Sequence, residues 1–136
     1  MLKVLIVEDD LMIADYLEEV LVDAGYEVCG IAATVKDAIE LAEQYNPDLG
    51  IIDLRLADGT DGTEVAAVLR ERGRFGVLYV TGNPHSPRLI QAEGEGYLAK
   101  PYSASTVVAA LRIVADLNFD LPLSSGLPRG FTRLGA

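Results

Sequence analysis

The sequence predicts an α/β protein built on a doubly wound parallel sheet of five strands. Short apolar runs with strand character alternate along the chain with segments whose apolar residues recur at helical spacing. Turn and capping residues stand between them. Strands that alternate with helices form parallel sheets with both faces covered, and five such units in about 115 residues fit the strand order 2-1-3-4-5.

Five short apolar segments are expected to be the strands. The third is the most telling, because an apolar run that begins at Leu49 ends abruptly at a carboxylate, Asp53, and a glycine-rich turn follows it. A buried strand with this pattern places its acid at the carboxyl edge of the sheet. The expected strands cover residues 2–7, 26–32, 49–53, 75–80 and 97–99.

The first two helices have clear start and stop signals. Asp10 can cap the first helix, whose apolar stripe runs through residues 13–24 until Gly25 ends it. Thr34 begins a capping box for the second helix, and the turn at residues 46–48 separates that helix from the third strand.

The second half of the chain is less regular. A third helix is expected over residues 62–72, and Ser103 or Ser105 should cap the last helix. Between the fourth and fifth strands, residues 82–96 are rich in proline and glycine, and their helical candidate is short, at 88–92.

The domain organisation follows from where helical periodicity stops. Residues 1–116 are expected to form one domain, and no internal repeat or second domain is visible. Residues 117–136 are rich in proline, glycine and serine, and are expected to be a flexible tail or the stub of a linker.

Composition narrows the class of protein. Half of the residues are hydrophobic, which argues against disorder, but no apolar run approaches the roughly 18 residues of a membrane helix. A net charge of −10 disfavours direct nucleic-acid binding and suits a divalent cation and basic protein partners. The single cysteine allows no internal disulfide, and no signal peptide is visible, so we expect a cytoplasmic protein without a membrane association.

Polar side chains follow four of the predicted strands at their carboxyl ends. Glu8 and Asp9 follow the first strand, Asp53 ends the third, Thr81 follows the fourth and Lys100 follows the fifth. Clustered carboxylates repel one another unless a cation neutralises them, and Mg²⁺ prefers such oxygen ligands. A carboxylate can also attack phosphorus, and an amine and a hydroxyl can then bind the phosphoryl oxygens. These residues together predict phosphoryl transfer to Asp53.

The chain resembles the receiver domain of two-component response regulators, which has the flavodoxin-like fold. The resemblance covers residues 2 to about 115, and its motifs stand in the family's order and spacing. They are VLIVEDD at 4–10, IDLRL at 52–56 with DG at 61–62, VTG at 80–82 and GYLAKP at 96–101.

The resemblance implies a role for each matching residue. Asp53 would accept a phosphoryl group from a histidine kinase or a histidine phosphotransfer protein. Glu8, Asp9, Asp53 and the backbone carbonyl of Arg55 would hold Mg²⁺. Lys100 would contact the phosphoryl group, and the Lys100–Pro101 peptide bond would be cis.

The resemblance also implies a switch rather than an enzyme. Thr81 and Tyr97 would be the switch pair: the hydroxyl moves to the phosphoryl group and the ring turns inward. The fourth helix, fifth strand and fifth helix would form the output surface for a protein partner. The protein would assist only its own phosphorylation and dephosphorylation.

Two departures from the family pattern stand out. Ala57 replaces a proline that the family often has four residues after the phosphorylated aspartate, and the path from Asp53 to Asp61 is one residue longer than usual. The run of residues 81–84 and the irregular segment after it resemble a subgroup of stand-alone receivers from alphaproteobacteria, in which the fourth helix is mobile.

These residues leave three alternative functions to consider. The first is a stand-alone receiver that acts as a phosphate shuttle, a phosphate sink or a regulator of a partner. The second is the receiver half of a longer regulator. The third is an enzyme or a flavin-binding protein on a similar sheet, which the sequence disfavours. A haloacid-dehalogenase-like phosphatase needs an acid where Arg55 stands. A flavodoxin-like site needs a phosphate loop after the first strand, where the acids at 8–10 would repel the phosphate.

Overall fold

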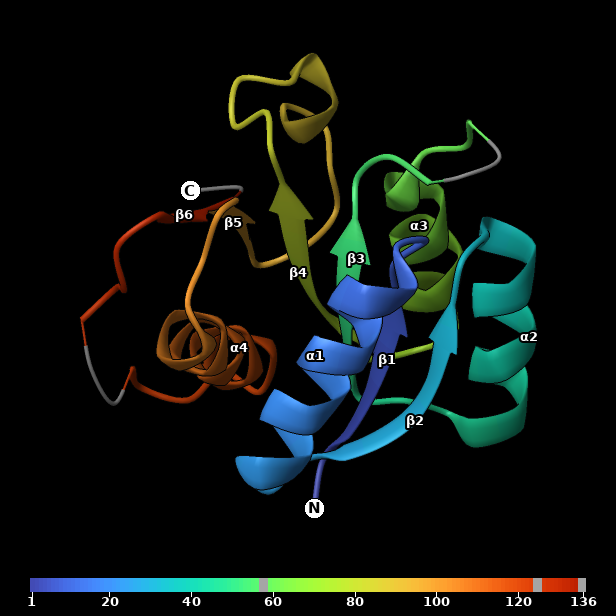
Figure 1. The fold of residues 1–136 in the computed structure, drawn as a ribbon, viewed down its shortest axis with the longest axis horizontal. Coiled ribbons are helices and arrows are strands. Elements are labelled where there is room, and N and C mark those ends of the chain that lie inside the picture. Colours follow the sequence, from blue (N-terminus) through green and yellow to red (C-terminus); the bar gives the residue numbers. More distant parts are fainter. Residues whose placement is uncertain (57–58, 124–125, 135–136) are drawn as a thin grey trace.

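A computed structural model of the chain describes residues 1–56, 59–123 and 126–134. Its centre is one sheet in the order β2-β1-β3-β4-β5-β6, in which the first five strands are parallel and β6 runs antiparallel to β5. Figure 1 shows this sheet with its helices on both faces. The predicted fold class and the order 2-1-3-4-5 are therefore confirmed, and the sixth strand is an addition.

The helices and strands alternate as the sequence indicates, and each of the five predicted strands begins and ends within one residue of its expected bounds. In chain order they are β1 (Lys3–Val7), α1 (Leu11–Asp23), β2 (Glu27–Ala32), α2 (Val35–Tyr45), β3 (Leu49–Asp53), α3 (Gly62–Glu71), β4 (Gly76–Thr81), a 3₁₀ helix (Pro87–Leu89), β5 (Gly96–Ala99), α4 (Ala104–Asn118) and β6 (Phe131–Arg133).

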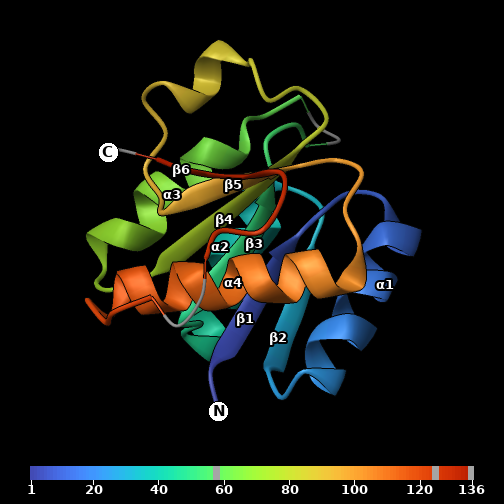
Figure 2. The same ribbon diagram turned by 90° about the vertical axis from the view of Figure 1, so that its left-hand side faces the viewer.

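Two layers of helices bury the sheet. Helices α1 and α4 cover one face of the sheet, and α2 and α3 cover the other, as both Figure 1 and Figure 2 show. Leu17 and Leu111 belong to the first hydrophobic cluster, and Ala38 and Val65 belong to the second. Strand β3 is buried along its whole length, which is why its sequence is apolar up to Asp53.

The predicted capping residues begin their helices. Asp10 accepts hydrogen bonds from the backbone N–H groups of Met12 and Ile13 at the start of α1. Thr34 caps α2, and Ser103 rather than Ser105 caps α4. These side chains satisfy donors that the first helical turn leaves without a partner.

The segment between β4 and β5 contains a short 3₁₀ helix within residues 82–95, which are yellow above the carboxyl ends of the strands in Figure 1. It begins at Pro87 rather than at 88, because the Ser86 hydroxyl caps the N–H of Arg88 and proline is tolerated in a first turn. The buried Tyr79 holds this segment, since its hydroxyl donates to the carbonyl of Glu93 at 2.7 Å.

The end of the chain differs from the flexible tail expected from residue 117. Helix α4 continues to Asn118, and residues Phe131–Arg133 form β6 against β5. The buried ring of Phe131 joins the cluster under α4, which explains why this segment is held. A three-residue strand flanked by glycine and proline carries almost no periodic signal in the sequence.

Helix α3 starts directly against the strand that carries Asp53. Asp61 caps the helix, and the N–H of Gly62 donates to the carbonyl of Leu54 at 2.9 Å. A Cβ atom on Gly62 would collide with the backbone carbonyl of Asp53. Ala57, which stands where the family often has proline, and Asp58 lie outside the described residues.

None of the helices in the described parts of the chain has the length and apolar character needed to cross a membrane.

The contact at Gly62 gives a prediction about stability. We expect Gly62→Ala to lower the free energy of unfolding by about 2–3 kcal/mol, because the new methyl group meets backbone atoms that cannot rotate away. Gly82→Ala is the matched control, since nothing lies within 4 Å of a Cβ built there. Urea unfolding of both variants measures the effect, and equal stabilities would contradict this account of the junction.

Candidate functional site

The candidate site forms at one edge of the sheet, where parallel strands end together. Val7 pairs with Ile52 and Asp53 pairs with Val80, so the residues that follow β1 lie beside the end of β3. Thr81 pairs in turn with Ala99, one residue before Lys100. Parallel register therefore brings the acids, the hydroxyl and the amine of four strands to one place.

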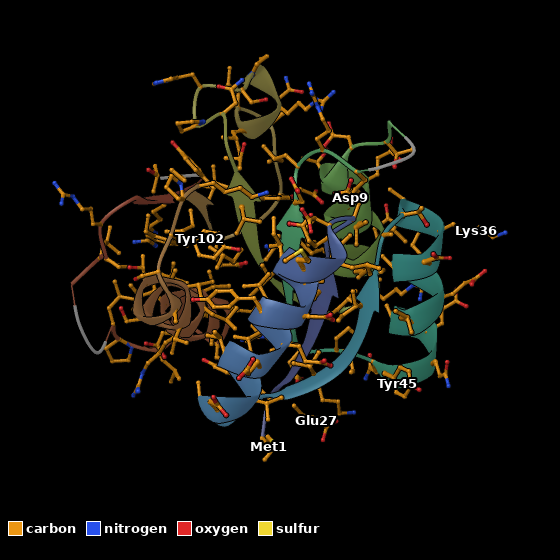
Figure 3. All side chains as sticks on the ribbon, in the orientation of Figure 1. Met1, Asp9, Glu27, Lys36, Tyr45 and Tyr102 are labelled. Atoms are coloured by element: carbon orange, nitrogen blue, oxygen red, sulfur yellow. The ribbon has the colours of Figure 1, made fainter. Side chains whose placement is uncertain are left out.

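Three of the predicted ligands form one acidic cluster. Glu8, Asp9 and Asp53 each offer an oxygen, and these atoms lie within 4.8 Å of one another. Glu8 and Asp53 are buried, whereas Asp9 is exposed, and Figure 3 shows Asp9 above the end of β1. This spacing could hold one metal ion, with the exposed side open to further ligands.

Glu8 is the most constrained acid of the cluster. Its side chain is 2% exposed; Oε2 accepts a hydrogen bond from the N–H of Asp10, while Oε1 has no hydrogen-bond partner in the described parts of the chain. Burial raises the pKa of Glu8 to about 7, an effect that the Asp10 hydrogen bond opposes and the negative charge of Asp53 increases. A buried carboxylate oxygen without a donor fits a site made to receive a cation or a proton.

Lys100 joins the acids. Its ammonium nitrogen lies 3.2 Å from Oδ2 of Asp53 and 3.6 Å from Oε1 of Glu8. Burial on its own would lower the pKa of Lys100, but the negative charges of Asp53 and Glu8 outweigh it and the pKa is raised. The Lys100–Pro101 peptide bond is cis, the form implied by the resemblance.

Asp53 faces a cleft of about 620 Å³. Its Oδ1 accepts a hydrogen bond from the N–H of Arg55 at 3.2 Å, so Oδ1 and Oδ2 both have fixed partners. The cleft lies between the end of β3 and the segment after β4. Its lining residues are Asp53, Leu54, Arg55, Thr81, Gly82, Asn83, Ser86, Pro87 and Arg88.

The two candidate switch residues occupy β4 and β5. The buried hydroxyl of Thr81 donates to the carbonyl of Asn83 and accepts from its N–H, at 3.2 and 2.9 Å. The side chain of Tyr97 is half-buried, and its backbone stands in register between Tyr79 and Thr132. Thr81 thus lines the same cleft as Asp53 with its hydroxyl bonded to Asn83.

Two residues near the site were missed by the sequence analysis. Arg88 forms an ion pair with Asp61 at 3.2 Å and lines the cleft, but nothing in its irregular segment signals this position. Tyr102 lies beside Lys100 in an apolar pocket, and burial together with the charges of Glu8 and Asp53 raises its pKa to about 12. Its place directly after Lys100 and Pro101 could have revealed it.

The arrangement suits chemistry on a charged oxygen. Lys100 neutralises part of the negative charge of the cluster, and the open cleft gives access to Asp53. A cation held by the three carboxylates would offset the rest. In this arrangement the Asp53 carboxylate can accept a group that carries several anionic oxygens, because positive charge is available beside it.

A family model for the response regulator receiver domain matches residues 4–112. Curated relatives include the transcriptional regulatory protein PdtaR of Mycobacterium tuberculosis, 32% identical over 84% of this chain, and the phyllosphere-induced regulator PhyR of Methylorubrum extorquens, 31% identical over 80% of it. The matches cover 57% and 42% of these relatives, so the chain spans about half of their length. Both relatives are named as regulators, not as enzymes.

Solved structures agree with this match. The receiver domain of a modulated diguanylate cyclase from Desulfovibrio desulfuricans superimposes with a TM-score of 0.78 at 29% identity, covering 88% of this chain and 97% of that one. A CheY-like receiver domain protein from Methanospirillum hungatei gives a TM-score of 0.78 at 27% identity, covering 88% and 98%. With the family model matched over most of its length, the chain belongs to the response regulator receiver domain family.

Proposed function

We propose that this protein is the phosphoacceptor of a two-component phosphorelay, with Asp53 as the residue that is phosphorylated. The observation that carries the proposal is the position of the Lys100 ammonium, 3.2 Å from Asp53 and 3.6 Å from Glu8, at the edge of a three-carboxylate cluster. Such a cluster offers a nucleophile, cation ligands and a donor to a phosphoryl oxygen in one place.

In the proposed reaction, one carboxylate oxygen of Asp53 forms a bond to phosphorus as the phosphorus–nitrogen bond of a phosphohistidine breaks. The imidazole leaves with the electron pair and takes a proton from solvent. Glu8, Asp9, Asp53 and the carbonyl of Arg55 would hold Mg²⁺, which supplies charge neutralisation at the phosphoryl oxygens. Lys100 donates a charge-assisted hydrogen bond to the same group.

Phosphorylation would then act on the switch residues. The phosphoryl group adds about −1.5 to −2 charges. Thr81 would exchange its bonds to Asn83 for one to the phosphoryl group, and Tyr97 would turn inward. Such a ligand biases a two-state element by a few kcal/mol at most, about what is needed to shift binding of a protein partner.

The partners are a histidine kinase or a histidine phosphotransfer protein, in the cytoplasm, and a downstream protein. Among similar solved structures are those of the anti-anti-sigma factor PhyR from Bartonella quintana, 27% identical, so a protein target fits the family. The acidic chain makes direct nucleic-acid or membrane binding unfavourable.

A second candidate is the receiver half of a longer regulator. The chain matches only 57% and 42% of the two relatives described above, and this observation favours it. The intact mass of the native gene product separates this candidate from a stand-alone receiver. Both candidates share the same chemistry at Asp53.

The central prediction concerns Asp53. With Mg²⁺ and acetyl phosphate, we expect the wild-type protein to gain the mass of one phosphoryl group, and Asp53→Asn to gain none because an amide is a poor nucleophile. Intact mass spectrometry measures this, and Asp58→Asn, an acid five positions later in the sequence, is the control. If the Asp53→Asn variant were labelled like the wild type, Asp53 would lose its assigned role.

The Lys100 ammonium gives a prediction about the rate of phosphorylation. We expect Lys100→Ala to slow phosphorylation of Asp53 by about 100-fold, because the variant loses a charge-assisted donor to the phosphoryl oxygens. Mass spectrometry of samples quenched at successive times gives the rate. Lys36→Ala, at an exposed position on α2, is the control because it also removes one positive charge. Equal rates for both variants would remove Lys100 from the reaction.

Glu8 links the site to pH. Its pKa is about 7 in the folded protein and 4.5 in an unperturbed chain, so between these values the folded state binds more protons than the unfolded state. Stability without metal should therefore fall as pH rises from about 4.5 to 7, by up to about 3 kcal/mol, and then level off. We expect Glu8→Gln, which stays neutral, to lack this fall.

The measurement is urea unfolding at pH 5, 6, 7 and 8 with EDTA and again with Mg²⁺. Mg²⁺ should reduce the fall in the wild type, because it favours the ionised carboxylate, and should leave the pH dependence of the stability of Glu8→Gln almost unchanged. Glu19→Gln, exposed on α1, controls for the loss of one charge. Parallel stability curves for wild type and Glu8→Gln would rule out Glu8 as the titrating group.

A further inference from the structure

The outer edge of β5 is covered by the end of the same chain. Strand β6 pairs with β5 in antiparallel register, Gly96 with Arg133, Tyr97 with Thr132 and Leu98 with Phe131. Two further backbone bonds extend the pairing: the N–H of Ala99 donates to Gly130 at 3.1 Å, and that of Leu134 donates to Glu95 at 3.0 Å. Figures 1 and 2 both show β6 alongside β5.

The contact between β5 and β6 includes a space, which we call the seat, that the Phe131 ring fills above Gly96. Phe131 is buried against the cluster that contains Leu98 and Leu111, and its ring lies over Gly96. A Cβ atom on Gly96 would collide with this ring and would lie 2.8 Å from the carbonyl oxygen of Thr132. The absence of a side chain at position 96 is therefore what lets a neighbouring strand approach here.

A second side chain of this segment packs on the other face of the sheet. Leu134, three residues after Phe131, packs against the cluster of α2 and α3, to which the half-buried Tyr97 also belongs. Thr132 and Arg133, which lie between these two, are exposed. The segment that lies along β5 thus has one aromatic residue and one aliphatic residue, packed on opposite faces of the sheet, with two exposed polar residues between them.

Few buried contacts keep this segment against β5. Strand β6 has only three residues, and Phe131 is its one buried side chain. It is joined to α4 by residues 119–130, which contain no helix or strand among those that the structure describes. Short edge strands with few buried contacts open locally far more easily than the core.

We propose that the β5 edge is a docking site for an extended segment of a protein partner, and that Phe131–Leu134 is a built-in competitor for it. The partner would add a strand antiparallel to β5, with an aromatic side chain over Gly96 and an aliphatic one against the cluster of α2 and α3. This inference goes beyond the proposed function and does not require phosphorylation of Asp53.

The test uses the full chain and a synthetic peptide with the sequence of residues 128–134. In the wild type the tethered strand competes at an effective concentration near the millimolar range, so the peptide should bind weakly. In the full-length Phe131→Ala variant the competitor is weakened, and we expect peptide affinity to rise at least about tenfold. Amide NMR shifts of residues 95–99, followed to millimolar peptide, measure both affinities.

Two controls separate binding of an aromatic ring over Gly96 from non-specific binding. A peptide with alanine at the position of Phe131 should not shift these amides, and the Gly96→Ala/Phe131→Ala chain should not bind the native peptide because the new methyl group fills the seat. Leu134→Ala offers a second opening of the same edge if Phe131→Ala is poorly folded. It should raise peptide affinity by a smaller factor.

The proposal is overturned if peptide affinity is equal for wild type and both opened variants, or if the Gly96→Ala double variant binds as well. A wild-type dimer in light scattering, lost on Gly96→Ala substitution, would also overturn it, because the strand would then come from a second copy. Acetyl phosphate labelling of Asp53 in the same samples reports on the proposed function separately. It should be unchanged in Phe131→Ala.

Discussion

The ion pairs of Lys100 with Asp53 and Glu8 are the interaction on which the site depends. Three carboxylates within 4.8 Å repel one another, and two of them are buried, so a nearby cation is needed to keep them together. The rest of the fold serves this contact. Apolar strands under two layers of helices carry the acids and the lysine to one edge, where the parallel register fixes their separation.

Much of this was predictable from the sequence because it depends on local signals. Asp10, Thr34 and Gly25 mark helix ends by their own chemistry, and an apolar run that stops at Asp53 indicates both a strand and its functional tip. Parallel topology then places Glu8 beside Asp53 without further information. The acidic cluster could therefore be predicted from the sequence alone.

What could not be predicted depends on contacts between distant segments. Strand β6 forms because Gly96 leaves room for the Phe131 ring, a match between residues 35 positions apart that no periodicity reveals. The ion pair of Arg88 with Asp61 likewise joins an irregular segment to the cap of α3. The bonds of the Thr81 hydroxyl to Asn83 depend on the turn geometry after β4. Such pairings are properties of the folded surface, not of a local pattern.

The loop between β3 and α3 is closed at its base. An isolated bridge joins Arg55 to Asp61, the N–H of Leu56 donates to Thr60, and Gly62 is bonded to Leu54. The extra residue relative to the family therefore leaves the start of α3 in place. The same closure makes the segment between Leu56 and Thr60 an insertion point for protein engineering, because an added reporter would leave the base of the loop and the start of α3 intact.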